Sequence, residues 1–190
     1  MAVYTTISKN NLLIIEKKFN LKKIIKFQGI KSGIENTNYL LKTKKEKYIL
    51  TIFEKRVDKK DLPFFMELMD KLYKYNINCP RPLKNKNKKY LITIKNKPAS
   101  VVTFVNGKDK KILSNQDCYN IGKNIAKLHI ASNKINLFRK NSMSVNNLGF
   151  LLKSLQFKSN SILPNIKEIL QQNLKEIKKE WPKKLPAGII

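Results

Sequence analysis

Residues 27–56 constrain the fold more than any other stretch of the chain, because they have the pattern of three short strands joined by tight turns. An apolar run over residues 24–27 stops at Gly29. A second run begins at residues 39–41, and a third, over residues 48–53, is rich in β-branched and aromatic side chains. Runs of this kind, bounded by glycine-containing or lysine-rich turns, are typical of antiparallel strands. The stretch therefore predicts a three-stranded unit.

The turn between the first two strands is the main candidate binding site. Gly29 and Gly33 lie four positions apart in it, and its polar side chains are those of Ser32, Asn36 and Asn38. Glycines let backbone N–H groups approach an anion, and amides and hydroxyls add further donors. A hairpin turn that needs positive φ would select the same glycines. The P-loop pattern GxxxxGK[ST] is absent, whereas protein kinases cover ATP phosphates with a glycine-rich loop that is followed by a third strand.

The chain is strongly basic, with a formal net charge of +27 over 190 residues. Such a charge suits nucleic acid or an anionic membrane as a partner. However, only Arg56, Arg81 and Arg139 are arginines, and base readout and bidentate phosphate binding favour arginine over lysine. The lysines are also spread over every segment. We therefore favour a compositional bias and expect no nucleic-acid and no membrane partner, with a basic nucleic-acid-binding module as an alternative.

Cysteine usage and the hydropathy pattern point to the cytoplasm. Cys79 and Cys118 lie far apart without a CxxC pair, and the chain has one histidine. This offers no metal cluster and no disulfide framework, and it suits a reducing compartment. The first residues lack a secretory pattern, and no apolar run approaches the ~18 residues of a membrane span. We predict a soluble cytoplasmic protein.

The segments around the three-stranded unit complete a larger sheet. Helical spacing predicts a helix over residues 8–19, capped by Ser8, and another that starts at Asp61, which would act as its N-cap. Two further strands are predicted at residues 90–94 and 99–105, joined by the turn KNKP. The result is a five-stranded antiparallel sheet with helices.

After Gly107 the chain is expected to be helical. Ser114 and Asp117 have the spacing of a capping box. His129 lies near the end of the helix that they open, and we expect it to be packed and hydrogen-bonded rather than catalytic. Two later helices are predicted at residues 147–157 and 166–181. The two predicted lobes are residues 1–106 and residues 107–190.

Particular segments carry a resemblance that covers the whole chain. They are MAVYT at 1–5, FQGIKSGIENTNYLL at 27–41, YILTIFEKRVDKKDLPFF at 48–65, CPRPL, PASVVTFVNG, IGKNIAKLH, NSMSVNNL and EWPKKLPAGII at the end. In these segments the chain resembles the bacterial homoserine kinases of the aminoglycoside-phosphotransferase fold. The resemblance implies an α+β, protein-kinase-like fold with an N-terminal ATP-binding lobe and an incomplete helical C-terminal lobe.

The resemblance also implies an activity and a set of site residues. The activity is phosphorylation of L-homoserine by ATP to O-phospho-L-homoserine in threonine biosynthesis, with Mg²⁺ as the metal. Another small-molecule kinase of the same fold, of the aminoglycoside or choline kinase type, is the alternative. The implied nucleotide-binding residues are Gly29, Ile30, Ser32, Gly33, Asn36 and Asn38 over the phosphates, Ile49 above the purine, Thr51 on the third strand, and Thr103, Phe104 and Val105 in the hinge.

Two features depart from the kinase pattern. If Ile49 stands for the alanine of the kinase V-A-I-K strand, Thr51 stands for its lysine, and a hydroxyl cannot replace that cation. Lys42 or Lys55 is then the candidate to reach the phosphates, and Glu67 lacks its usual lysine partner. The catalytic loop of the family, H-x-D-x-x-x-x-N, follows the segment that matches LPAGII. We therefore expect the catalytic residues and Mg²⁺ ligands beyond Ile190, and expect this chain to be truncated and inactive alone.

Overall fold

The computed structural model of the chain describes residues 3–55, 57–159, 164–182, 184 and 188–189. Its contacts divide the chain into two compact units. The first comprises Met1–Leu137 with Gly188–Ile190, and the second comprises Phe138–Ala187. None of the described helices is long and apolar enough to cross a membrane. The predicted lobe boundary between residues 106 and 107 is a functional division and stays a prediction.

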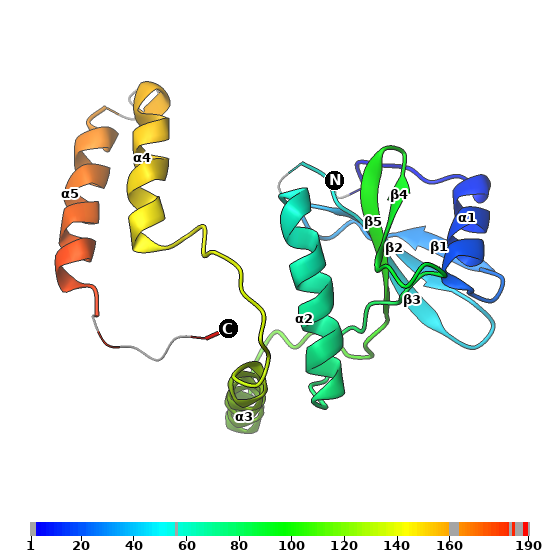
Figure 1. Cartoon of the computed structure of the whole chain (residues 1–190). Coiled ribbons are helices and arrows are strands. Elements are labelled where there is room, and N and C mark those ends of the chain that lie inside the picture. Colours follow the sequence, from blue (N-terminus) through cyan, green and yellow to red (C-terminus); the bar gives the residue numbers. More distant parts are fainter. Residues whose placement is uncertain (1–2, 56, 160–163, 183, 185–187, 190) are drawn as a thin grey trace. The chain divides into compact units, whose positions relative to one another are not determined.

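The first unit is built on the predicted five-stranded antiparallel sheet (Figure 1). Its strands follow the order β1-β2-β3-β5-β4. The strands are β1 (Lys26–Gly29), β2 (Thr37–Lys42), β3 (Lys47–Ile52), β4 (Leu91–Ile94) and β5 (Lys97–Thr103). The predicted five-stranded antiparallel sheet is therefore confirmed.

The β4–β5 hairpin is tighter than predicted. Its loop consists of Lys95 and Asn96, both with positive φ (47° and 61°), and Ile94 pairs with Lys97. Two-residue loops with positive φ match the twist of the flanking strands, so the pairing starts directly after the loop. The last strand accordingly begins at Lys97 rather than at residue 99, and it ends before Phe104.

Alternation of side chains along β2 and β3 gives the sheet one buried and one half-exposed face. The buried face packs on α1 (Lys9–Phe19) through fully buried residues that include Ile15, Leu41 and Leu50. Helix α1 begins as predicted, because Ser8 and Asn11 form a reciprocal capping box. This helix therefore belongs to the core on one face of the sheet and does not cover the opposite face.

Helix α2 (Leu62–Lys74) packs on part of the opposite face, so α1 and α2 lie on different sides of the sheet (Figure 1). Asp61 is the N-cap residue of α2 and proline follows in the first turn, as predicted, but the Asp61 side chain makes no capping hydrogen bond. Asp61 has helical backbone angles, because it ends a short 3-10 turn, η1 (Lys59–Asp61). Asp58 caps that turn by accepting from the N–H of Lys60.

The extended segment after α2 pairs with the outer edge of β5. Pro82 bridges to Val102, and the N–H of Leu83 donates to the carbonyl of Val101 (2.8 Å). The prolines leave the chain extended, and extended backbone can pair with the free part of the β5 edge beyond β4. The extended segment after α2 is therefore held against β5 next to the predicted hinge.

The later helices are α3 (Asn115–Ser132), α4 (Val145–Ser159) and α5 (Ile166–Glu180). Ser114 and Asp117 form the predicted capping box of α3. The expectation for His129 is wrong, because its side chain is exposed and forms no hydrogen bond with the described part of the chain. In the second unit α4 and α5 pack on each other, and Trp181 and Pro182 follow the end of α5.

Candidate nucleotide-binding site

An apolar strip crosses the half-exposed face of the sheet. Leu40 of β2 pairs with Ile49 of β3, which in turn pairs with Val102 of β5, so the three side chains lie in one row. Leu40 and Ile49 are half-buried, whereas Val102 is buried. Side chains that are partly covered and aligned in this way form a flat apolar surface for a planar ring. Ile49 lies in the middle of the strip.

The glycine turn lies at one end of the paired strands. Its hairpin is closed by a hydrogen bond from the N–H of Ile30 to the carbonyl of Asn38 (2.8 Å). Gly33 has φ of +102° and no atom within 4 Å of a Cβ placed on it, so its glycine serves the backbone conformation. Gly29 serves packing instead, because a Cβ there would lie 2.9 Å from Cγ2 of Val3. Ser32 is exposed in the turn.

Two asparagines next to the turn use their carbonyl oxygens within the protein. Oδ1 of Asn36 accepts from the N–H of Glu54 (3.2 Å), and Oδ1 of Asn38 accepts from the hydroxyl of Thr51 (2.8 Å). Their side-chain NH₂ groups have no acceptor in the described part of the chain. An amide fixed through its oxygen presents its two N–H donors in a set direction. These donors are suited to an anion.

The predicted hinge lies at the other end of the strands. Thr103 exchanges two hydrogen bonds with Arg81, its N–H donating to the carbonyl and its hydroxyl accepting from the N–H (both 2.9 Å). The N–H of Phe104 donates to the carbonyl of Lys47 (3.2 Å). Val105 is exposed, and its N–H has no acceptor among the residues whose placement is described. Of the three hinge residues, Val105 therefore has the backbone donor that is open to a ligand.

The register separates the turn and the hinge along one face. Asn38 pairs with Thr51 near the turn, and Tyr48 pairs with Thr103 at the hinge. Three residues of β3 separate Thr51 from Tyr48, which corresponds to roughly 10 Å of strand. A nucleotide has its base and its phosphates at opposite ends, so donor groups on the two sides of the apolar strip, one toward the turn and one toward the hinge, match its layout.

The structure also places the candidate cations. Thr51 is hydrogen-bonded to Asn38 and supplies no charge. Lys42 ends β2 opposite Lys47, at the hinge end, so it lies away from the turn, whereas Lys55 follows β3 close to it. Glu67 of α2 has a partner on its own helix, because Nζ of Lys71 lies 2.9 Å from its carboxylate.

A buried carboxylate joins α2 to the sheet. Asp70, with a side chain only 6% exposed, accepts from Nε of Arg81 (3.2 Å) and from the hydroxyl of Tyr90 (3.0 Å), and Nζ of Lys74 lies 3.2 Å from it. Burial by itself would raise the pKa of Asp70, but hydrogen bonds from Lys74, Tyr90 and Arg81 outweigh it and hold the pKa below its ordinary value. Burial and the bond to Asp70 raise the pKa of Tyr90 to about 12.

A second buried carboxylate anchors the N-terminal segment beside the turn. Oε1 of Glu54 accepts from the hydroxyls of Thr5 and Thr37 (2.7 Å each), and Oε2 accepts from the ammonium of Lys97. Burial favours a raised pKa for Glu54, but the hydrogen bonds from Lys97, Thr37 and Thr5 lower it below its ordinary value. Tyr4 extends this anchor, because its hydroxyl donates to the carbonyl of Ile34 in the turn (3.0 Å).

Sequence reasoning missed both carboxylate clusters. Asp70 carried a usable signal, since it lies four residues after Met66 on the buried side of α2, where a charged side chain needs partners. Glu54 gave none, because its partners Thr5 and Lys97 are 49 and 43 residues away along the chain. Contacts of that separation depend on strand order.

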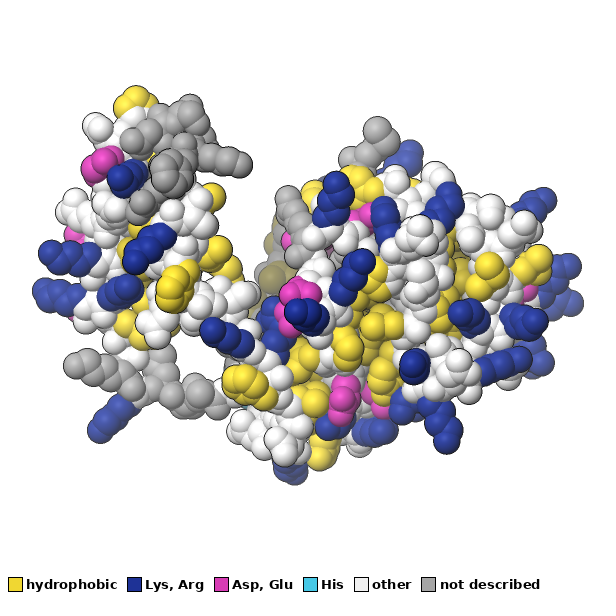
Figure 2. All heavy atoms as spheres, turned by 45° about the horizontal axis from the view of Figure 1, so that its top comes forward, with side chains coloured by type: hydrophobic (Ala, Val, Ile, Leu, Met, Phe, Trp, Pro, Cys, Tyr) yellow, Lys and Arg dark blue, Asp and Glu magenta, His cyan; other side chains and the backbone are white. Residues whose placement is uncertain are grey.

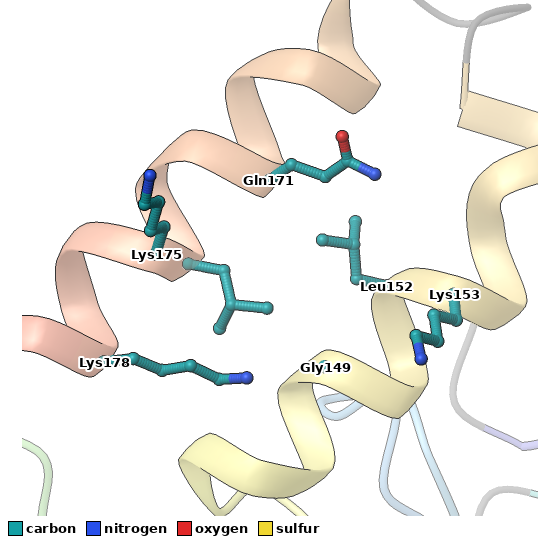
Figure 3. A pocket seen from close by; sticks show the side chains of 7 residues that line it. Gly149, Leu152, Lys153, Gln171, Lys175 and Lys178 are labelled. Carbon is teal, nitrogen blue, oxygen red and sulfur yellow. The ribbon is translucent and has the colours of Figure 1, made fainter.

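The second unit contains a hollow of about 300 Å³ between α4 and α5 (Figure 3). Leu152 points from α4 into it, and Gly149 leaves room for the end of Lys178, whose Nζ would lie 3.5 Å from a Cβ at that glycine. Neither helix of this unit has a buried residue among those described. No predicted nucleotide-binding residue lines the hollow, so it is not part of the candidate site.

Within the described part of the chain, neither surface charge nor possible metal ligands indicate a second binding site. Figure 2 shows lysines scattered over the visible surface rather than gathered in one patch, in line with the predicted compositional bias. Among the described residues, no three histidine, cysteine, aspartate or glutamate side chains gather in a way that could hold a metal ion. The residues described here therefore do not fit a Mg²⁺ site.

Two relatives match the chain over its whole length. A homoserine kinase of Bartonella tribocorum is 34% identical and one of Rhizobium meliloti is 35% identical, each over all 190 residues of the chain. These matches cover 60% and 58% of the two relatives, so the chain spans about three-fifths of their length. The name homoserine kinase describes the activity of those two relatives.

Solved structures show the fold independently. A spectinomycin phosphotransferase in complex with ADP and spectinomycin has a TM-score of 0.61 at 13% identity, over 96% of this chain and 60% of its own. A putative fructosamine-3-kinase from Haemophilus somnus has a TM-score of 0.53 at 15% identity, over 91% and 62%. A model described as the phosphotransferase enzyme family matches residues 26–190. With a kinase-like sheet and a family match over most of its length, the chain belongs to the phosphotransferase enzyme family.

Proposed function

We propose that this chain is the nucleotide-binding part of a homoserine kinase, which transfers the γ-phosphoryl group of ATP to the hydroxyl of L-homoserine. The observation that carries the proposal is the similarity to homoserine kinases along all 190 residues, at 34% and 35% identity. The product would be O-phospho-L-homoserine, on the route to threonine. The site geometry supports a nucleotide as one of the two substrates.

The proposed binding mode uses the apolar strip and the donors on either side of it, at the turn and at the hinge. The strip around Ile49 receives the adenine, and the open N–H of Val105 donates to the edge of the base. The NH₂ groups of Asn36 and Asn38, with the backbone of the turn at Gly33, donate to the phosphates. Hydrogen bonds to a charged group are stronger than neutral ones, so two oriented amides contribute substantially.

Transfer itself is assigned to the part of the relatives that this chain does not span. Positioning and charge neutralisation supply most of the catalysis of phosphoryl transfer. The described residues position the nucleotide and do not form a metal site. Nucleotide binding is therefore assigned to this chain, and the catalytic loop and metal ligands are assigned to the part of the relatives that the chain does not span.

Turnover tests the substrate. The protein is purified in the form that its cells produce and is incubated with ATP and Mg²⁺. The release of ADP is then measured in parallel reactions with L-homoserine, choline or an aminoglycoside as the second substrate. The proposal predicts release that depends on L-homoserine and formation of O-phospho-L-homoserine by mass spectrometry. Release with choline or the aminoglycoside, and none with L-homoserine, would assign the chain to a sister kinase.

Nucleotide binding is tested on the 190-residue chain itself. The variant Asn38→Asp keeps an oxygen for the Thr51 hydroxyl but replaces the NH₂ group with a negative oxygen that repels phosphate. We expect it to lose the thermal stabilisation that ATP gives the parent chain. The variant Asn10→Asp makes the same change in charge at an exposed position of α1 and should keep the response. Equal responses from both variants would remove Asn38 from the site.

A further inference from the structure

Residues 3–5 lie along the glycine turn and contact both its start and its middle. At the start of the turn, Val3 packs against Gly29, where a Cβ would lie 2.9 Å from Cγ2 of Val3. In the middle of the turn, the hydroxyl of Tyr4 donates to the carbonyl of Ile34 (3.0 Å). The turn therefore rests against a segment that precedes it in the chain by 30 residues.

The backbone of this segment is held by hydrogen bonds to the sheet. The N–H groups of Tyr4 and Thr5 both donate to Oγ1 of Thr37 at the start of β2 (2.9 and 3.1 Å). The hydroxyl of Thr5 donates to Glu54 (2.7 Å), and its carbonyl accepts from the hydroxyl of Tyr39 (3.1 Å). Thr5 and Thr37 are buried. The segment is therefore fixed to the sheet and can support the turn.

The middle of the turn is exposed, whereas its two ends are paired. Residues 31–35 are all exposed, and Ile34 is 71% exposed. The ends are held by the hydrogen bonds of Ile30 and Asn36 described above. The hydroxyl of Tyr4 reaches the exposed part of the turn, and Tyr4 is itself 56% exposed. This hydrogen bond can therefore be removed without opening the core.

We propose that Tyr4 is a positioning residue for the nucleotide, because its hydroxyl holds the middle of the glycine turn in the place where the turn meets the phosphates. The inference rests on the proposed function of the turn. Ile34, whose carbonyl accepts the bond, directly follows Gly33, whose backbone is proposed to donate to the phosphates. Ordering a loop on binding lowers affinity, whereas a loop held in place beforehand avoids that loss. The Tyr4 hydroxyl thus acts on phosphate binding through the turn.

Tyr4→Phe removes the hydroxyl and keeps the ring, and isothermal titration calorimetry of the 190-residue chain gives the dissociation constants of ATP and adenosine. The constant for ATP should rise about fivefold, the equivalent of one ordinary hydrogen bond. The constant for adenosine should not change, because the adenine is proposed to lie on the strip around Ile49. Tyr119→Phe makes the same change at a tyrosine of α3 that is 63% exposed, and both constants should stay as in the parent. Trypsin should cleave after the exposed Lys31 faster in Tyr4→Phe, since the middle of the turn is then released.

The comparison of the two constants distinguishes positioning of the turn from general stability. Unchanged ATP binding or unchanged cleavage after Lys31 in Tyr4→Phe would overturn the proposal. An equal rise for ATP and adenosine would also overturn it, because Tyr4 would then support only the stability of the fold, and so would an equal loss of ATP binding in Tyr119→Phe. Absence of ATP binding by the parent chain would refute the nucleotide site itself and with it the role of Tyr4, whereas the other outcomes leave the nucleotide site in place.

Discussion

Variants at Glu54 should separate two contributions to the free energy of unfolding, that of the hydroxyl hydrogen bonds and that of the ion pair with Lys97. The side chain of Glu54 is 10% exposed and that of Lys97 is 38% exposed. Two hydroxyl bonds to a buried carboxylate contribute about 1.5 kcal/mol each. An ion pair with a half-exposed lysine contributes about 1 kcal/mol after allowance for solvent screening. Glu54→Ala should therefore cost roughly 4 kcal/mol, or about 12 °C in thermal midpoint at roughly 3 °C per kcal/mol for a chain of this size.

Two companion variants decide which contribution dominates. Glu54→Gln keeps an oxygen for the hydroxyls of Thr5 and Thr37, which share Oε1, and presents an amide to Lys97. It should cost about half as much as Glu54→Ala, and Lys97→Met should cost about 1 kcal/mol. Urea unfolding followed by circular dichroism gives all three free energies. Equal losses for Lys97→Met and Glu54→Ala would refute the reasoning, because the ion pair would then carry the anchor.

The same carboxylate predicts the pH dependence of the anchor. The pKa of Glu54 is lowered in the folded protein from an ordinary value of 4.5. A group with a depressed folded pKa contributes its full stability above the unfolded pKa, and the contribution is lost as the pH falls through the folded pKa. The difference in stability between the parent and Glu54→Gln should thus be constant above about pH 5.5 and shrink below pH 4.5. A difference that grows on acidification would contradict the assigned sign.

Three further predictions concern residues around the site. Gly29→Ala should cost about 1 to 3 kcal/mol in unfolding free energy, because its Cβ would meet Val3 at 2.9 Å, and the companion Val3→Ala should recover part of the loss. Asp70→Asn should lose less unfolding free energy than the parent when the pH is lowered from 6 to 3. The pKa of Asp70 is lowered in the folded parent, so the stability that its carboxylate contributes is lost as the pH falls below 3.8. Tyr90→Phe removes one donor to that carboxylate and should cost about 1.5 kcal/mol by urea unfolding.

The sheet was predictable because its signals are local. Runs of β-branched and aromatic residues marked β2 and β3, and the Ser8 and Ser114 caps placed the starts of two helices. Differences from the prediction arose where two local signals compete. Asp58 and Asp61 both precede the same helix, and the first caps the 3-10 turn that the second closes. Lys95 has positive φ although it is not a glycine, so the sequence contains no glycine that would mark this tight loop.

The site was predictable only as a set of positions. The sequence places Gly29 and Gly33 in one turn, but it does not reveal that Gly29 makes room for Val3 whereas Gly33 supplies positive φ. It also cannot tell that the N–H groups of Thr103 and Phe104 are occupied. These differences depend on which strand or N-terminal segment lies alongside. The periodicity of residues within one segment does not reveal which other segment packs against it.

The distribution of donors along the half-exposed face separates two kinds of anion binding. Near the glycine turn the open donors on this face are neutral amides, each held by a hydrogen bond to the protein. At the hinge end they belong to the exposed lysines Lys26, Lys42 and Lys47 of three neighbouring strands. Oriented neutral donors select an anion by geometry and lose little affinity to salt, whereas unpaired ammonium groups attract any anion and are screened over a Debye length of about 10 Å at 0.1 M salt. We therefore expect the binding of a triphosphate at the turn to depend on the orientation of the Asn36 and Asn38 amides.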